Sequence, residues 1–206
     1  MATNLCEKLL DKCISVSCSD PIYEGAENLA YIFNKSDIAS VTYDVQDPNI
    51  VTDITMRVIE EGSGSDPDVL ATGFKITTLG KSPFNGTNTT LQEGDIMNTF
   101  TELFDFAVQD NSPLAAGILN NLANGKYVVV IENNYPGSDG KGKYQILGLK
   151  KGLTVNTMER NLYDDTYNGG WHVQMQAEKT PTAALFVYKT DLETTKSYLE
   201  GLVSCE

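Results

Sequence analysis

The most β-branched run of the chain extends from Lys126 to Glu132 and is apolar at consecutive positions. Such a run is typical of a central strand that is covered on both faces. A second apolar run, 144–149, follows an interval rich in Gly, Asn and Pro. Two strand-like runs that flank turn-forming residues predict an antiparallel hairpin, which we expect to form the floor of the core.

Alternation of apolar and polar residues predicts further strands around this hairpin. The expected strands are 29–33, 40–45, 50–60, 69–79, 98–109, 170–175 and 183–189. Segments 50–60 and 69–79 are expected to pair as a second hairpin, whose tip 60–68 consists of turn-forming and acidic residues. Segment 80–94 is rich in Asn and Thr and is expected to be a loop.

A helix is predicted after residue 112, because Ser112 is a favourable N-cap and Pro113 suits the first helical position. Gly125 is expected to end this helix in the left-handed conformation. The apolar stripe expected to face the core consists of Leu114, Ile118, Leu119 and Leu122.

Two capping boxes predict one helix near each end of the chain, at 4–13 and from Thr190 onward. We therefore expect an N-terminal helix and arm over 1–28 and a single β-rich domain with a C-terminal helix over 29–206. The fold class is mainly β (α+β), an antiparallel β-sandwich or barrel with two or three flanking helices.

The formal charge of −13, from 28 acidic and 15 basic residues, disfavours stable binding to nucleic acid or anionic lipid. Acids dominate 40–75, whereas 126–151 forms a basic island with five lysines against two acids. Opposite charges on one chain could serve head-to-tail self-association, or the island could be a solvated face without a partner. No apolar run approaches the roughly 20 residues of a membrane helix, and no signal peptide is evident, so we expect no membrane partner and synthesis in the cytoplasm.

The four cysteines lie near the two ends of the chain and form no CxxC pair. With a single histidine in the chain, a zinc site is not expected, and free thiols in a reducing compartment are favoured. These cysteines are Cys6, Cys13, Cys18 and Cys205.

Several local patterns in the sequence resemble catalytic or ligand-binding motifs. Segment 137–144 approaches a phosphate-binding loop, but Tyr144 replaces the Mg²⁺-binding hydroxyl and a strand pattern follows it. His172 lies on a predicted strand, on the face opposite the core, without a nucleophile signature. The carboxylate pairs Asp164–Asp165 and Glu60–Glu61 could serve a glycosidase, and 164–168 could bind calcium, but solvated loops explain both. We predict no catalytic, cofactor-binding or metal-binding residues and no enzyme activity.

Four features of the last half of the chain occur in a recognisable order. They are 126–130 before a Gly-rich hairpin, 148–153, the strand entry 169–171 and the closing helix 190–196. Across about 95–202 the chain resembles virion structural proteins of tailed bacteriophages, particularly phages of gut Bacteroidetes.

This resemblance implies a virion protein that self-assembles as a hexameric or larger ring or tube in the tail or neck, in contact with other virion proteins. DNA would pass through its negatively charged conduit without sticking. Expected contact segments are 60–68, 134–143 and the N-terminal arm. The alternative is a capsid decoration or carbohydrate-binding β-module, in which Trp171 and the ten tyrosines would stack on sugars. A hydrolase that uses Asp164 is a third hypothesis.

Overall fold

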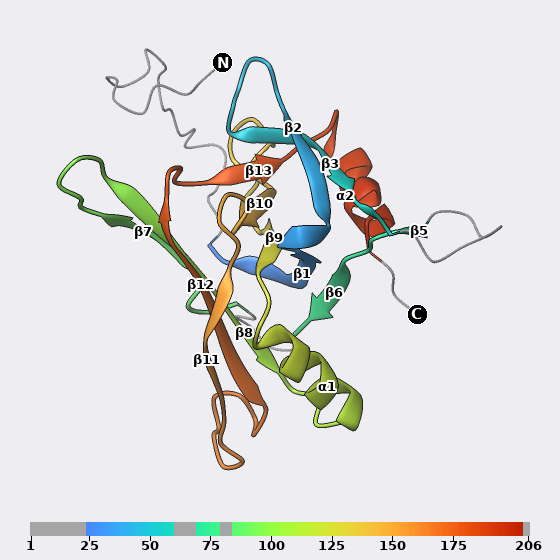
Figure 1. The fold of residues 1–206 in the computed structure, drawn as a ribbon, viewed down its shortest axis with the longest axis vertical. Coiled ribbons are helices and arrows are strands. Elements are labelled where there is room, and N and C mark those ends of the chain that lie inside the picture. Colours follow the sequence, from blue (N-terminus) through green and yellow to red (C-terminus); the bar gives the residue numbers. More distant parts are fainter. Residues whose placement is uncertain (1–23, 60–68, 79–83, 204–206) are drawn as a thin grey trace.

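The computed structural model describes residues 24–59, 69–78 and 84–203, which form two packed β-sheets and two α-helices (Figure 1). The seven-stranded sheet has the order β2-β3-β13-β10-β9-β1-β6. Its strands are Ala26–Asn34 (β1), Ile38–Tyr43 (β2), Ile50–Met56 (β3), Phe74–Thr77 (β6), Tyr127–Asn133 (β9), Tyr144–Leu147 (β10) and Leu185–Val187 (β13).

The four-stranded sheet has the order β11-β12-β8-β7. Its strands are Asn88–Gln92 (β7), Thr99–Val108 (β8), Thr154–Arg160 (β11) and Trp171–Thr180 (β12). A short ladder joins Val58–Ile59 (β4) to Val69–Leu70 (β5), and the helices are Pro113–Leu122 (α1), Leu192–Gly201 (α2) and the 3-10 turn Lys35–Asp37. The predicted mainly β sandwich with flanking helices is confirmed. No described helix has the length and apolar character to cross a membrane.

Strand β9 is buried on both faces, as its unbroken apolar sequence predicts. Tyr127, Val129 and Ile131 enter a cluster between the two sheets, which we call the inner cluster. Val128 and Val130 enter a second cluster on the opposite face, beneath α2. The predicted pairing of 126–132 with 144–149 is also confirmed, because β9 and β10 are antiparallel neighbours.

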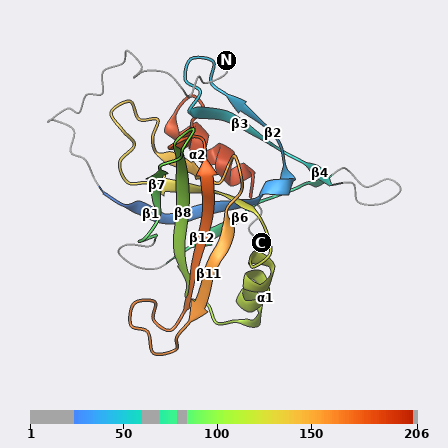
Figure 2. The same ribbon diagram turned by 60° about the vertical axis from the view of Figure 1, so that its left-hand side comes forward.

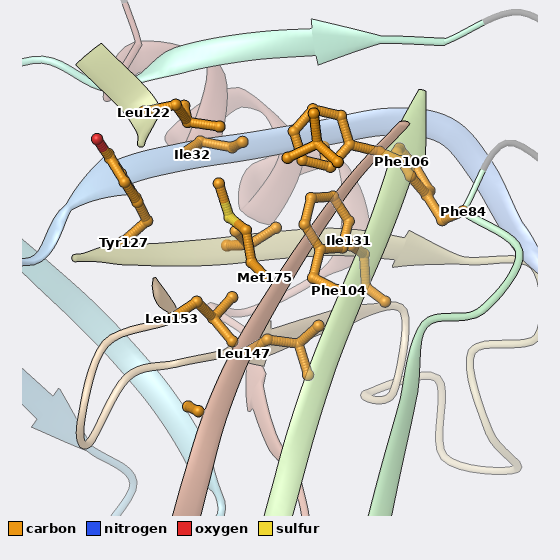
Figure 3. Close-up of a cluster of buried hydrophobic side chains, with 14 of the residues drawn as sticks. Ile32, Phe84, Phe104, Phe106, Leu122, Tyr127, Ile131, Leu147, Leu153 and Met175 are labelled. Carbon is orange, nitrogen blue, oxygen red and sulfur yellow. The ribbon is translucent and has the colours of Figure 1, made fainter. Parts of the chain in front are cut away.

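The inner cluster is built around aromatic side chains of the four-stranded sheet (Figure 3). The rings of Phe104 and Phe106 lie 5.1 Å apart, and Phe84 lies 5.3 Å from Phe104. Met175 and Leu147 pack against them from β12 and β10. One face of the four-stranded sheet is thereby buried, whereas the side chains of the opposite face do not enter the inner cluster.

The predicted N-cap of α1 is confirmed, whereas the cap of α2 is Asp191, one residue after the Thr190 of the predicted capping box. The Ser112 hydroxyl accepts a hydrogen bond from the Ala115 N–H at 3.1 Å, and the Asp191 carboxylate accepts one from the Thr194 N–H at 2.7 Å. The second cap holds α2 over the cluster formed by the seven-stranded sheet.

The buried face of α1 differs from the predicted one. Leu119 and Leu122 are buried as expected, but Leu114 and Ile118 are 73% and 46% exposed. Ala115 takes the place of Leu114 on the buried face, because a small residue in the first turn lets the helix approach the sheet closely. The outer face of α1 is therefore apolar.

Gly125 was expected in the left-handed conformation and does not adopt it. A Cβ at this position would collide with the side chain of Tyr127, whose hydroxyl donates to the Asn121 carbonyl at 3.0 Å. The position therefore needs glycine for the close approach of an aromatic ring, not for its backbone angles.

The hairpin predicted between 50–60 and 69–79 is reduced to the β4–β5 ladder. Strand β3 pairs with β2 on one side and, in parallel, with β13 on the other, so neither side is left for β6, which pairs with β1 instead. The loop prediction for 80–94 was also wrong in part, because β7 forms there by pairing with β8.

Several predictions fall outside the described residues. They include the helix at 4–13, the arm up to residue 23, the tip 60–68 and all four cysteines. Strand β1 begins at Ala26, so the last residues assigned to the arm belong to the sheet.

Glu102 of β8 is a carboxylate on the buried side of the four-stranded sheet, with 3% of its surface exposed. It accepts a hydrogen bond from the Gly148 N–H at 2.6 Å, which links the two sheets. Burial raises the pKa of this carboxyl, and the Gly148 hydrogen bond offsets the shift in part.

A raised pKa in the folded state means that Glu102 favours folding below its ordinary pKa and that this contribution is lost as pH rises through the folded pKa. We therefore expect Glu102→Gln to gain stability relative to the native chain when pH is raised from 4 to 8. Urea unfolding at several pH values measures this difference. The exposed Glu178→Gln is the control, and a pH-independent effect of Glu102→Gln would contradict the prediction.

Candidate assembly surface

The outer face of the four-stranded sheet points away from the inner cluster and is polar. Its outward positions hold Asn88, Thr90 and Gln92 of β7, Thr101, Leu103, Asp105 and Ala107 of β8, His172, Gln174, Gln176 and Glu178 of β12, and Thr154, Thr157 and Glu159 of β11. Hydroxyl and amide side chains dominate this set, and its charged members are Asp105, Glu159, Glu178 and His172. Lys179, exposed where β12 is irregular, lines a hollow together with Thr101, Gln176 and Glu178. Figure 2 shows the four strands side by side along the length of the molecule.

Both edges of this sheet are open within the described part of the chain. Strand β7 pairs only with β8, and β11 pairs only with β12. An open edge presents unpaired N–H and C=O groups, which natural proteins commonly protect with charges, prolines or a covering element. Strand β7 has the sequence Asn-Thr-Thr-Leu-Gln and carries none of the charged or proline protections.

Large apolar side chains are exposed at the turns that end the long strands. Ile96, in the β7–β8 turn, is 100% exposed, and Tyr163, in the β11–β12 turn, is 92% exposed. Met97 and Leu162 accompany them in these two turns. Grouped exposed apolar residues mark interaction sites more often than single ones do.

His172 lies at the centre of a polar cluster on the outer face. Its Nε2 is 2.9 and 3.0 Å from the two carboxylate oxygens of Asp105, and its Nδ1 is 3.4 Å from Glu159. The ring of Tyr167 stacks on the imidazole with a centroid distance of 4.6 Å. The Gln174 amide donates to the Asp105 carboxylate at 3.1 Å.

The same cluster reaches the edge strand β7. The Asp105 N–H donates to the Thr87 hydroxyl at 3.1 Å, directly before β7 begins. Gly86, with φ +107°, brings the backbone close, because a Cβ there would lie 3.0 Å from the Asp105 carboxylate. Asp105 and His172 therefore connect all four strands of the sheet from its outer side.

The electrostatics of this cluster favour a charged imidazole. Burial alone lowers the pKa of His172, but the hydrogen bonds and charges of Asp105 and then Glu159 outweigh it, so the net pKa is raised. Both ring nitrogens face carboxylates, and neither is left as a base for a substrate. A hollow of about 190 Å³ beside Tyr167 and Asp164 adjoins the ring, but the arrangement fits a structural ion pair better than general-base catalysis.

The structure locates the other candidates for chemistry. Segment 137–144 is a turn with Gly137 and Gly140 at positive φ, and Tyr144 begins a strand, so no helix follows as a phosphate-binding loop requires. The Asp164 carboxylate accepts from the Thr166 N–H at 2.7 Å, which is ordinary turn chemistry. No group of three potential metal ligands occurs among the described residues, and Glu60–Glu61 lies outside them.

Trp171 packs against the inner cluster, and the Arg160 guanidinium lies 6.0 Å from its ring centroid. Two contacts hold the turn 134–143 against the rest of the protein: the Lys143 ammonium lies 3.3 Å from the Glu132 carboxylate, and the Lys141 ammonium lies over the Tyr188 ring.

Asp105 is the residue of this surface whose role the sequence analysis missed. The available signal is an acid between Phe104 and Phe106, in the apolar second half of β8. Its pairing with His172 depends on the β8–β12 register, in which Asp105 lies opposite Gln174 and Ala107 opposite His172. Sequence spacing contains no information on that register.

Comparisons with known proteins leave the function to be argued from this surface. No protein-family model, curated protein or solved structure matches the chain.

The His172–Asp105 pair predicts a pH-dependent stability. Because the folded pKa of His172 is raised, its contribution is complete below its ordinary pKa of 6.5 and is lost as pH rises through the folded value. We expect His172→Ala to cost about 3 kcal/mol at pH 6, since it leaves the buried Asp105 uncompensated, and less at pH 9.

Urea unfolding measures this cost, and the single histidine of the chain gives one NMR titration curve for the native protein. Glu159→Gln is the matched control and should cost less than about 1 kcal/mol, because the Glu159 side chain is 70% exposed. An equal effect of His172→Ala at both pH values would show that the pair acts by packing alone.

Proposed function

We propose that this protein is a structural component of a tailed-phage virion, which assembles head to tail into a ring or tube of the tail or neck. The observation that supports this proposal most is the four-stranded sheet, whose two edges are open and whose polar face is uncovered as far as residues 24–59, 69–78 and 84–203 are concerned. The proposed role also follows the resemblance of the sequence to phage virion proteins.

The strand directions favour a head-to-tail contact between copies. All neighbours in the four-stranded sheet are antiparallel, so its edge strands β7 and β11 run in opposite directions. If β7 of one copy lies beside β11 of the next, the alternation of directions continues across the contact. Such a heterologous contact, repeated with a fixed rotation, closes into a ring.

The outer face of the sheet suits the wall of a DNA conduit. A basic wall would bind phosphate by counterion release and hold the DNA. Asp105, Glu159 and Glu178 instead add negative charge, against the basic side chains of His172 and Lys179, and most of the other polar side chains are neutral amides and hydroxyls. This arrangement supports passage without adhesion.

The chemistry of the described residues adds no support for an enzyme, because the His172 ring nitrogens both face carboxylates. The alternative function, a capsid decoration or carbohydrate-binding module, requires exposed aromatic rings. Tyr163 is exposed, but Trp171 is engaged with the inner cluster and Arg160. Of the expected contact segments, 134–143 is described, whereas 60–68 and the arm up to residue 23 lie outside the described residues.

Purified protein is expected to form rings or tubes that are visible by negative-stain electron microscopy. Thr90→Lys places a charge on the exposed outer face of β7 and should reduce the assembled fraction about 10-fold, because edge lysines oppose strand pairing. The stability of the monomer should change by less than about 0.5 kcal/mol.

Thr55→Lys makes the same charge change at an exposed position of the seven-stranded sheet and should leave assembly intact. A native protein that stays monomeric at high concentration, or binds capsids or glycans as a monomer, would contradict the proposed function.

A further inference from the structure

The turn between β7 and β8 combines acidic and exposed apolar residues. Residues 93–98 read Glu-Gly-Asp-Ile-Met-Asn, and the Gly94 N–H donates to the Asn98 side chain at 3.3 Å. Ile96 is fully exposed and Met97 is 42% exposed. We call residues 93–97 the hairpin tip; it combines two acids with two unburied apolar side chains.

A groove of about 440 Å³ lies beside the first residues of β11. Lys126 and Lys151 line it together with Gly152, Thr154 and Asn156, and we call it the lysine groove. Gly152 adopts φ +83°, and a Cβ there would lie 2.9 Å from the Lys126 Cβ. The aliphatic part of the Lys126 side chain therefore packs directly against Gly152. Glu178 at the rim is the groove's one acid.

The tip and the groove carry opposite charges, and Lys179 lines a hollow beside the tip together with Glu93 and Asp95. The acids of the tip and the lysines of the groove form no ion pair within the described residues. The ion pairs there involve Lys143, His172 and Lys189, so neither the groove lysines nor the acids of the tip take part. A further lysine, Lys35, is held nearby by its N–H, which donates to the Lys126 carbonyl at 2.8 Å. Burial and then the charge of Lys150 lower the pKa of Lys35, as expected where positive charge accumulates.

We infer that the hairpin tip of one copy docks into the lysine groove of the next copy. This inference rests on the proposed head-to-tail assembly and specifies its contact. In an antiparallel β7–β11 pair the end of β7 faces the start of β11, so Gln92 lies near Thr154 of the neighbour. The tip that follows Gln92 then meets the groove formed by the residues before Thr154.

The chemistry of the two surfaces matches at each point of this contact. Glu93 and Asp95 face the ammonium groups of Lys126 and Lys151. Ile96 and Met97 gain cover from the lysine stems and from Val155, which also lines the groove. Because the tip and the groove are different surfaces of one chain, each copy offers both halves, and the contact repeats from copy to copy.

Charge reversal with mixing tests this contact. Glu93→Lys with Asp95→Lys reverses the tip, and Lys126→Glu with Lys151→Glu reverses the groove. Each double variant alone is expected to lose assembly by about 10-fold or more, since like charges then meet across the contact. An equimolar mixture of the two variants should recover assembly, because reversed tips then meet reversed grooves in alternating copies.

The control is Glu193→Lys with Glu200→Lys, which makes the same charge change as the tip variant at exposed positions of α2, on the far side of the seven-stranded sheet. It should assemble like the native chain, and circular dichroism and thermal melting should show that every variant is folded. Sedimentation velocity gives the assembled fraction in each sample.

The outcomes separate the docking from the assembly itself. If the native protein forms rings and both charge-reversed variants assemble equally well, the docking is overturned and the proposed function stands. The same conclusion follows if each variant loses assembly and mixing the two does not restore it. A native protein that never assembles would overturn both proposals.

Discussion

Burial of β9 and β1 on both faces is the constraint on which the rest of the structure depends. Ala30 and Ile32 face the inner cluster, while Tyr31 and Phe33 face the cluster beneath α2. A strand that is apolar on both faces requires a covering layer on each side. The four-stranded sheet and α1 supply one layer and α2 the other, so the positions of the remaining elements follow from this requirement.

Among the described elements, the four-stranded sheet is covered on one face only, and this asymmetry creates the surface available for function. Its aromatic residues point into the inner cluster, and mainly polar side chains occupy its outer face. A single polar layer gives little cohesion, and the Asp105–His172 pair supplies a link that reaches from Thr87 to Glu159 across all four strands. The sheet is therefore held from both sides although only one side is packed.

Local patterns predicted the elements whose cause is local. The cap at Ser112 and the apolar run of β9 identify α1 and the central strand directly, and the capping-box pattern from Thr190 locates α2 to within one residue of its actual cap, Asp191. Strand β7 escaped prediction because its sequence lacks an apolar alternation and begins with Asn, a poor strand former, and because its structure depends on pairing with β8.

The candidate site was less predictable than the fold, since each contact in it joins distant parts of the chain. Asp105 and His172 are 67 positions apart and meet through the register of β8 and β12. Either Leu114 or Ala115 could contact the sheet at the start of α1, and helical periodicity alone does not decide between them. The prediction of the buried face of α1 was therefore wrong at Leu114.

The two edges of the sheet favour a closed ring over a dimer. Pairing of β7 with β7 by a two-fold axis would satisfy one edge and leave β11 open in both copies. Pairing of β7 with β11 satisfies both edges of every copy, provided that the rotation closes. The fully exposed Ile96 adds a free-energy argument, because full burial of such a side chain by a partner would contribute about 1.5–3 kcal/mol. The contact that uses both edges also covers this side chain, and a two-fold β7 pairing would leave the lysine groove unfilled.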